Sequence, residues 1–176
     1  MNLSGYNPND NKLSFAQQVM KHEYVHFVFD NSYSDSTGPR WYYERMAEFL
    51  STLRIVDGYL HYGEINAFRL KTSGREKKVN IEALLKADRI PESRKGKIDF
   101  YAHALTLIHF CHFKPGMREK LTKYLRMVEQ DHSVDVSFRQ AFGVDYASFD
   151  KIISKYFIEI NTSSGFLDFG NPVSSK

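Results

Sequence analysis

The segment at residues 22–26 reads His-Glu-Tyr-Val-His, and this H-E-x-x-H pattern constrains the chain more than any other feature. On a helix, residues four apart lie on one face, so His22 and His26 can offer two imidazole nitrogens to one metal ion. Glu23 is then placed beside that ion as a carboxylate that need not bind it. Two histidine ligands and a glutamate base are the arrangement of a zinc peptidase site. The alternative is a helix with two ordinary core histidines, because so short a pattern also arises by chance.

The residues around the motif have the spacing of an amphipathic helix. Apolar and imidazole side chains recur at spacings of 4, 3, 4 and 3, at Phe15, Val19, His22, His26 and Phe29. The pattern predicts a helix that begins after Ser14, a candidate N-cap, and runs to about residue 29. We expect both histidines on its inward face, together with Phe15, Val19 and Phe29.

A second helix offers a third ligand. Catalytic zinc commonly has three protein ligands and a water, and two histidines with a glutamate are a known set. Glu44 lies eighteen positions after His26, across a turn-rich loop at 30–38 and near the start of a helix predicted over 39–52. Glu48 follows one turn later on the same face. Buried carboxylates need partners, which a metal ion and a metal-bound histidine would supply.

The sequence after the second helix contains one hairpin signal. Strands at 53–56 and 59–62 flank Asp57-Gly58, a dipeptide that favours a tight two-residue turn. Together with the helices, this predicts a single-domain α+β fold that is predominantly helical, as the length of 176 residues allows. The predicted limits are a loose lead at 1–12, a folded domain at 13–160 and a polar tail at 161–176.

Apolar periodicity predicts a C-terminal lobe made of helices. Asn80 is a candidate N-cap for the first of them, and Asp145 and Ser148 are candidates for the last. These helices are expected at 81–86, 98–113, 117–129, 136–142 and 146–158.

The two metal-ligand segments resemble the gluzincin zinc metallopeptidases and, more narrowly, the bacterial peptidase-MA-like family. Members of that family carry H-E-Y-x-H, then P-R-W-x-x-E-G-x-A-E-F, then a segment similar to S-T-x-R-I-x-D-G. Later helices of the family read like F-Y-A-Q-S-W-x-L-V-H-Y and F-R-x-A-F-G-x-D. The resemblance spans about residues 18–158, and the matching segments lie at 22–26, 39–49, 51–58, 100–110 and 138–145.

The resemblance implies a metal site and a base. In the family pattern His22, His26 and Glu44 are the ligands of one Zn²⁺ ion, and Glu23 is the general base. Glu48 matches the acid that accepts a hydrogen bond from a ligand histidine, and such outer partners fix the imidazole tautomer. The implied fold is a gluzincin-like pair of metal-binding helices, one β-hairpin and a C-terminal helical lobe.

Three further positions are interpreted with the resemblance in view. Tyr101 matches the family's F-Y-A and is expected to donate to a developing oxyanion; the alternative is a core aromatic with a hydrogen-bonded hydroxyl. His109 matches a family histidine, and we expect it to be a satisfied core residue. Arg45 stands where the family has Gly. One position is about 100° around a helix, so we expect Arg45 to leave the Glu44 face and to turn outward or pair with a nearby acid. The alternative is that its guanidinium points into the cleft and pairs with a substrate carboxylate.

The reaction that the resemblance implies is zinc-dependent hydrolysis of a peptide bond in a peptide or protein substrate, with Glu23 activating a zinc-bound water. The alternative is a metal-binding but inactive pseudopeptidase that acts as an interaction module. Arg45 favours this alternative, as does the short polar lead where gluzincins place a β-sheet before the metal helix.

Composition limits the partners. A net charge of +3 implies no strong electrostatic partner, and we expect the basic residues between 75 and 97 to be solvated surface rather than a nucleic-acid site. No stretch is apolar enough to span a membrane. Residues 1–11 are polar and lack the apolar region of a signal peptide, although the resembled family is usually exported. Cys111 has no partner for an intrachain disulfide because it is the one cysteine of the chain.

Overall fold

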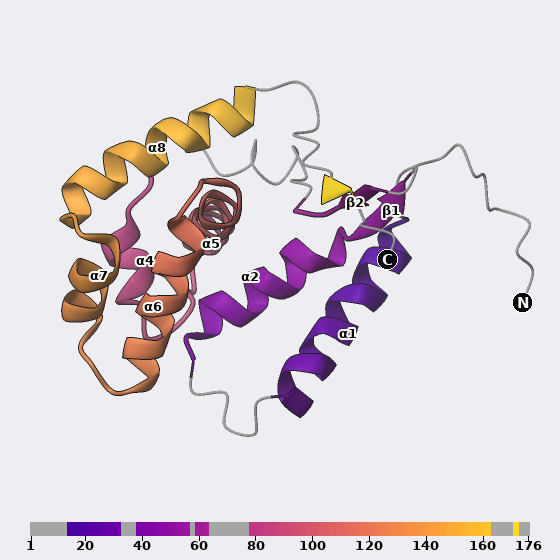
Figure 1. Cartoon of the computed structure of the whole chain (residues 1–176), viewed down its shortest axis with the longest axis horizontal. Coiled ribbons are helices and arrows are strands. Elements are labelled where there is room, and N and C mark those ends of the chain that lie inside the picture. Colours follow the sequence, from indigo (N-terminus) through magenta and orange to yellow (C-terminus); the bar gives the residue numbers. More distant parts are fainter. Residues whose placement is uncertain (1–13, 33–37, 57–58, 64–77, 163–170, 173–176) are drawn as a thin grey trace, which may run out of the picture.

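The computed structural model describes residues 14–32, 38–56, 59–63, 78–162 and 171–172. Helices make up most of this part of the chain, and three short strands form one sheet (Figure 1). The predicted α+β, predominantly helical fold is therefore confirmed. The elements are α1 (Phe15–Ser32), α2 (Arg40–Ser51), β1 (Arg54–Val56), β2 (Tyr59–His61), α4 (Ile81–Leu85), α5 (Arg94–Phe113), α6 (Met117–Glu129), α7 (Val134–Phe142), α8 (Tyr146–Thr162) and β3 (Asn171–Pro172).

Helix α2 lies between α1 and the C-terminal helices (Figure 1). It packs along α1 on one side and against α5 on the other. Helix α5 in turn contacts α4, α6 and α8, and α7 packs on α6. Every residue of α5 from Ala104 to Cys111 is buried, as expected for a helix at the centre of a core. The predicted helical lobe is thus assembled around α5, and α2 connects it to α1.

An aromatic contact fixes the end of α2 against α5. The ring of Phe49 lies 4.8 Å from that of His112 and 5.8 Å from that of Phe113, measured between centroids. Gly63, just after β2, donates its N–H to the Phe49 carbonyl at 3.3 Å and has a φ of +72°. A Cβ at this position would collide with the Phe49 ring. Glycine is required here both for the left-handed backbone and for the close approach.

The predicted hairpin is present. Strands β1 and β2 pair antiparallel, and the Asp57-Gly58 turn itself lies outside the described residues. The opposed pairs are Arg54 and His61, Ile55 and Leu60, and Val56 and Tyr59.

The third strand was not anticipated. β3 pairs antiparallel with β2, and Pro172 lies opposite Tyr59. Proline has no N–H to donate, so it is confined to sheet edges, and β3 is at the edge of this sheet. The predicted polar tail at 161–176 is corrected at two places, because α8 continues to Thr162 and residues 171–172 join the sheet.

Side-chain caps determine where α1 and α5 begin. Ser14 Oγ accepts from the Gln17 N–H at 3.3 Å, while Gln17 Oε1 accepts from the Ser14 N–H at 2.8 Å. This reciprocal capping box confirms the predicted start of α1. Helix α5 begins at Arg94, before the predicted Ile98, because Ser93 Oγ accepts from a backbone N–H at 3.1 Å and caps the helix.

Side-chain caps also fix the starts of α4, α7 and α8. Asn80 Oδ1 accepts from the backbone N–H three residues later at 2.9 Å, which confirms it as the cap of α4. Asp145 Oδ1 accepts from the Ser148 N–H at 2.7 Å, so Asp145 and not Ser148 caps α8. Ser133 caps α7 and moves its start to Val134, ahead of the predicted residue 136.

His109 is a core residue, as expected. A 2.6 Å hydrogen bond joins its Nδ1 to the hydroxyl of Tyr156 on α8, and its ring lies 4.5 Å from that of Phe113. Burial, with a smaller contribution from the nearby His112, lowers the pKa of His109 from 6.5 to about 4. The imidazole is therefore neutral in the folded protein at neutral pH.

Acidification from pH 7 to pH 5 is expected to reduce the free energy of unfolding by about 2 kcal/mol through His109 alone. The folded pKa is depressed, so the unfolded chain binds the proton first. The stability is complete above about pH 6.5 and is lost as the pH falls toward 4. Urea unfolding of the wild type and of His109→Gln at both pH values measures this loss, because glutamine at position 109 does not titrate. Equal losses in the two proteins would contradict the expectation.

Candidate metal centre

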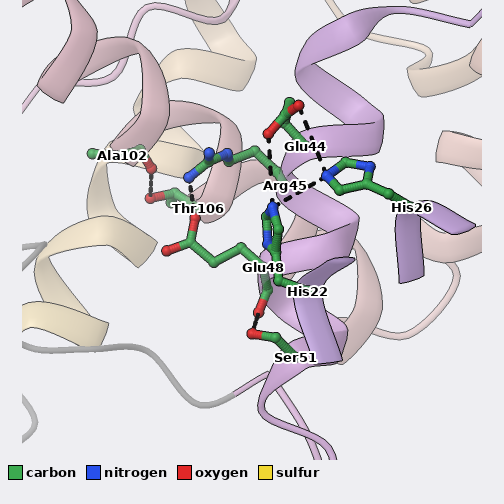
Figure 2. A network of polar contacts seen from close by, with 8 residues as sticks. All are labelled: His22, His26, Glu44, Arg45, Glu48, Ser51, Ala102 and Thr106. Atoms are coloured by element: carbon green, nitrogen blue, oxygen red, sulfur yellow. Dashed lines mark hydrogen bonds and ion pairs between the residues drawn. The ribbon is translucent and has the colours of Figure 1, made fainter. Parts of the chain in front are cut away.

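His22 and His26 lie one turn apart on α1 and face α2 (Figure 2). Their Nε2 atoms are 3.1 Å apart, and the ring centroids are 4.7 Å apart. Two imidazole nitrogens at this distance either share one proton or point at one common cation. The helical spacing of the motif is thus realised as a convergent pair of nitrogen donors.

Glu44 reaches the histidine pair from α2. Its carboxylate oxygens lie 4.0 Å from His22 Nε2 and 3.8 Å from His26 Nε2. Helices α1 and α2 pack along each other, and this packing brings the three side chains together across eighteen positions of sequence. Among the described residues, these three form the one group of His, Cys, Asp or Glu side chains whose ligand atoms all lie within 4.8 Å of one another.

The arrangement fits a zinc ion. Zinc bonds to nitrogen and oxygen are about 2.0–2.2 Å long, so the ligand atoms of a tetrahedral site lie roughly 3.3–3.5 Å apart. The two Nε2 atoms are 3.1 Å apart, slightly closer than that range, and the oxygen–nitrogen separations of 3.8 and 4.0 Å are slightly longer. A small opening of the imidazole pair and a small rotation of the carboxylate would bring all three separations into the range. The side chains of His22, His26 and Glu44 are 26%, 25% and 38% exposed. Solvent therefore reaches the group, as a site with a water-filled fourth position requires.

The electrostatic environment keeps His22 available as a ligand. Burial lowers the pKa of His22, and the neighbouring His26 acts in the same direction. The carboxylates of Glu44, Glu23 and Glu48 oppose this shift but do not reverse it. The neutral imidazole, which is the form that binds metals, is therefore favoured at neutral pH.

Glu23 is not one of the converging side chains, and its role as the general base stays a prediction. Glu23 follows His22 on α1 and is exposed, whereas both histidines are half-buried. The structure thus separates the two histidines and Glu44 from the carboxylate that the motif assigns to proton transfer.

The inward face of α1 differs from the expected one at Val19, which is exposed. Phe29 is on the inward face, where its ring packs 5.5 Å from that of Tyr43. Lys21, which the sequence analysis missed, also lies on this side, and its ammonium donates to the carbonyl of Leu53 just after α2. The contact ties α1 to the end of α2. A search for apolar residues at helical spacing does not find a half-buried lysine, because only its aliphatic stem is packed and its ammonium still needs a hydrogen-bond acceptor.

Three large apolar side chains are exposed on the outer face of α1, around the exposed Glu23. Met20, Tyr24 and Phe27 are 67%, 64% and 61% exposed, and their spacing places them along one side of the helix. The rings of Tyr24 and Phe27 stack with centroids 6.2 Å apart. The helix therefore carries two stripes with the same period, and the stripe with the histidines is the one that packs on α2.

Arg45 is turned into the protein. Only 7% of the residue is exposed, and its guanidinium donates to the carboxylate of Glu48 (Figure 2). The expected pairing with a nearby acid is present, but the outward orientation is wrong because α2 has a second buried side against α5. The role of Glu48 as a partner of a ligand histidine stays a prediction, and the structure adds a guanidinium partner that the sequence analysis did not foresee.

Tyr101 lies on α5 and presents its ring face to Arg45. The guanidinium carbon is 4.1 Å from the ring centroid, within the range of a cation–π contact. The residue is half-buried, and its ring also meets Phe100 edge to face at 5.7 Å. The proposed use of its hydroxyl as an oxyanion donor stays a prediction, whereas the contact of its ring is a feature that sequence reasoning missed.

No protein-family model matches the chain, and no match was found among curated proteins or solved structures. The site is therefore characterised by its own geometry and by the motif resemblance. Within the part of the chain that the structure describes, none of the helices is both long enough and apolar enough to cross a lipid bilayer.

Metal-depleted protein is expected to regain about one equivalent of zinc, because three protein ligands converge on one point. His22→Ala and His26→Ala should each lose this zinc. His132→Ala is the matched control, since His132 is exposed in the turn between α6 and α7. Elemental analysis after dialysis gives the metal content. Near-zero zinc in the reconstituted wild type would show that the three side chains are not a zinc site.

Proposed function

We propose that this protein is a zinc-dependent peptide-bond hydrolase of the gluzincin type. The observation that carries the proposal is the convergence of His22, His26 and Glu44 from two packed helices. The exposed Glu23 directly follows His22, and its charge acts on that imidazole. A zinc ion held there would act as a Lewis acid and lower the pKa of a coordinated water toward about 7. The substrate class is a peptide or protein.

Glu23 carries the proton transfers in this proposal. Its carboxylate accepts a proton from the attacking water and delivers it to the amine of the leaving group, which is general acid–base catalysis. The adjacent histidines are half-buried and face α2, so they are oriented to bind the metal rather than to exchange protons with substrate. Glu23 is the next residue after His22, about 100° further around α1, so its carboxylate can be directed toward a water on the ion that the histidines would hold.

Replacement of Glu23 by Gln should retain zinc and reduce peptide hydrolysis by roughly 10²–10⁴-fold, the usual scale of general acid–base catalysis. The ligand set is untouched by the change, and glutamine has a similar volume. Zinc content and turnover of a quenched fluorescent peptide library are measured on the same preparation. Undiminished turnover by the variant would remove Glu23 from the mechanism.

The motif resemblance implies that the hydroxyl of Tyr101 donates a hydrogen bond to the oxyanion that develops during hydrolysis. Loss of one donor to an oxyanion typically lowers kcat by about 10²–10³-fold. Tyr101→Phe removes the hydroxyl but keeps the ring that Arg45 covers. We expect the variant to bind zinc as the wild type does and to lose turnover by that factor. Full turnover would assign Tyr101 to packing alone.

A second candidate function is favoured by the outer face of α1. Exposed apolar stripes of this kind commonly mark protein contacts, and Met20, Tyr24 and Phe27 form one beside Glu23. The candidate is a metal-binding interaction module without turnover. Zinc-loaded wild type that cleaves peptides no faster than the metal-depleted protein would support the module, whereas zinc-dependent cleavage supports the hydrolase.

A further inference from the structure

Consecutive residues of α2 point to opposite sides of the helix. Glu44 faces α1 and the histidine pair, whereas Arg45 is buried and contacts Tyr101 of α5. Helix α2 packs against both of these helices. A step of about 100° per residue accounts for the change of direction. Adjacent residues therefore belong to the metal-facing side and to the α5-facing side of α2.

Glu48 is placed where it could face either side. It lies one turn after Glu44, so a carboxylate on this stretch of the helix can be directed toward the same histidines. Its field acts on His22 in the same direction as that of Glu44. In the structure, however, its carboxylate is turned toward Arg45 and accepts from the guanidinium (Figure 2).

The contacts of Arg45 use both parts of its guanidinium. One edge donates to Glu48, and the face lies 4.1 Å above the ring of Tyr101. A planar guanidinium can make both contacts at once, which an ammonium cannot do as well. The side chains of Arg45 and Glu48 are only 8% and 16% exposed. A pair so shielded from water is strongly held, because separating it would leave a charge unpaired in a poorly solvated place.

We propose that Arg45 is a positioning residue that holds the Glu48 carboxylate on the α5 side of α2, over the ring of Tyr101, and so reserves the metal-facing side for Glu44. This inference rests on the proposed metal site. Without Arg45, two carboxylates one turn apart on α2 would compete for the histidine pair. With Arg45, the ligand set is two histidines and Glu44. In this proposal Glu48 is the partner of Arg45, in place of the histidine partner that the family resemblance implies.

The test is a rescue experiment on zinc affinity, measured by competition with a chromophoric chelator. Glu44→Ala should weaken zinc binding by roughly 100-fold or more, since a ligand is lost and losing only an outer partner already costs about 10–100-fold. Arg45→Met with Glu44→Ala should regain at least about tenfold, because the released Glu48 replaces Glu44 as the carboxylate ligand. Adding Glu48→Gln to this pair should abolish the gain.

Two matched controls separate positioning from packing. Arg45→Lys with Glu44→Ala keeps a cation opposite Glu48 and should show no rescue. Combined with Glu44→Ala, Tyr101→Leu should give partial rescue and Tyr101→Phe none, since the ring face and not the hydroxyl supports Arg45. Circular dichroism verifies the helical content of every variant. A structural defect alone would lower zinc affinity further and could not restore it.

The outcomes distinguish this inference from the proposed function. A wild type without zinc affinity overturns both. A wild type that binds zinc, with Glu44→Ala weakened and the Arg45→Met pair no better, overturns only the positioning role. Rescue that survives Glu48→Gln also overturns it, because another group would then supply the ligand.

Discussion

The packing of α2 between α1 and α5 is the constraint on which the candidate site depends. On one side it brings Glu44 to His22 and His26, and on the other it buries Arg45 against α5. A helix buried on two sides cannot rotate about its axis without breaking one set of contacts, because packed interfaces leave little room for gradual adjustment. The orientation of the metal-facing carboxylate is therefore coupled to the helical lobe, although no lobe residue belongs to the ligand cluster.

Local chemistry made much of the fold predictable from sequence. Caps at Ser14, Asn80 and Asp145 depend on residues within three positions of each other, and sequence shows them directly. The face of α1 was harder to assign. The stripe with Met20, Tyr24 and Phe27 has the same helical period as the one with the histidines, so periodicity alone could not show that Val19 is exposed. The pairing of β3 with β2 depends on contacts far apart in sequence, and a two-residue strand has no alternation to reveal it.

The candidate site shows the same division between local and tertiary information. The spacing of His22, Glu23 and His26 follows from one helix, and Glu44 was found because its helix begins after a recognisable loop. The burial of Arg45 could not be predicted, because helical spacing gives the direction of a side chain around the helix axis but not which element packs against it. The motif match points to the hydroxyl of Tyr101, whereas in the structure the ring of Tyr101 contacts Arg45, which a motif match cannot reveal.

The charges around the histidine pair fit one divalent ion. Glu44, Glu23 and Glu48 are the carboxylates whose fields act on His22, and Arg45 is the cation that one of them binds. With neutral imidazoles, these three anions and one guanidinium have a formal charge of −2. A single Zn²⁺ balances this charge, whereas a second divalent ion would leave an excess of positive charge near half-buried groups, which is unfavourable. Removal of the guanidinium alone would instead leave the zinc-bound group with a net negative charge. Arg45 therefore contributes to the charge balance of the centre as well as to the direction in which Glu48 points.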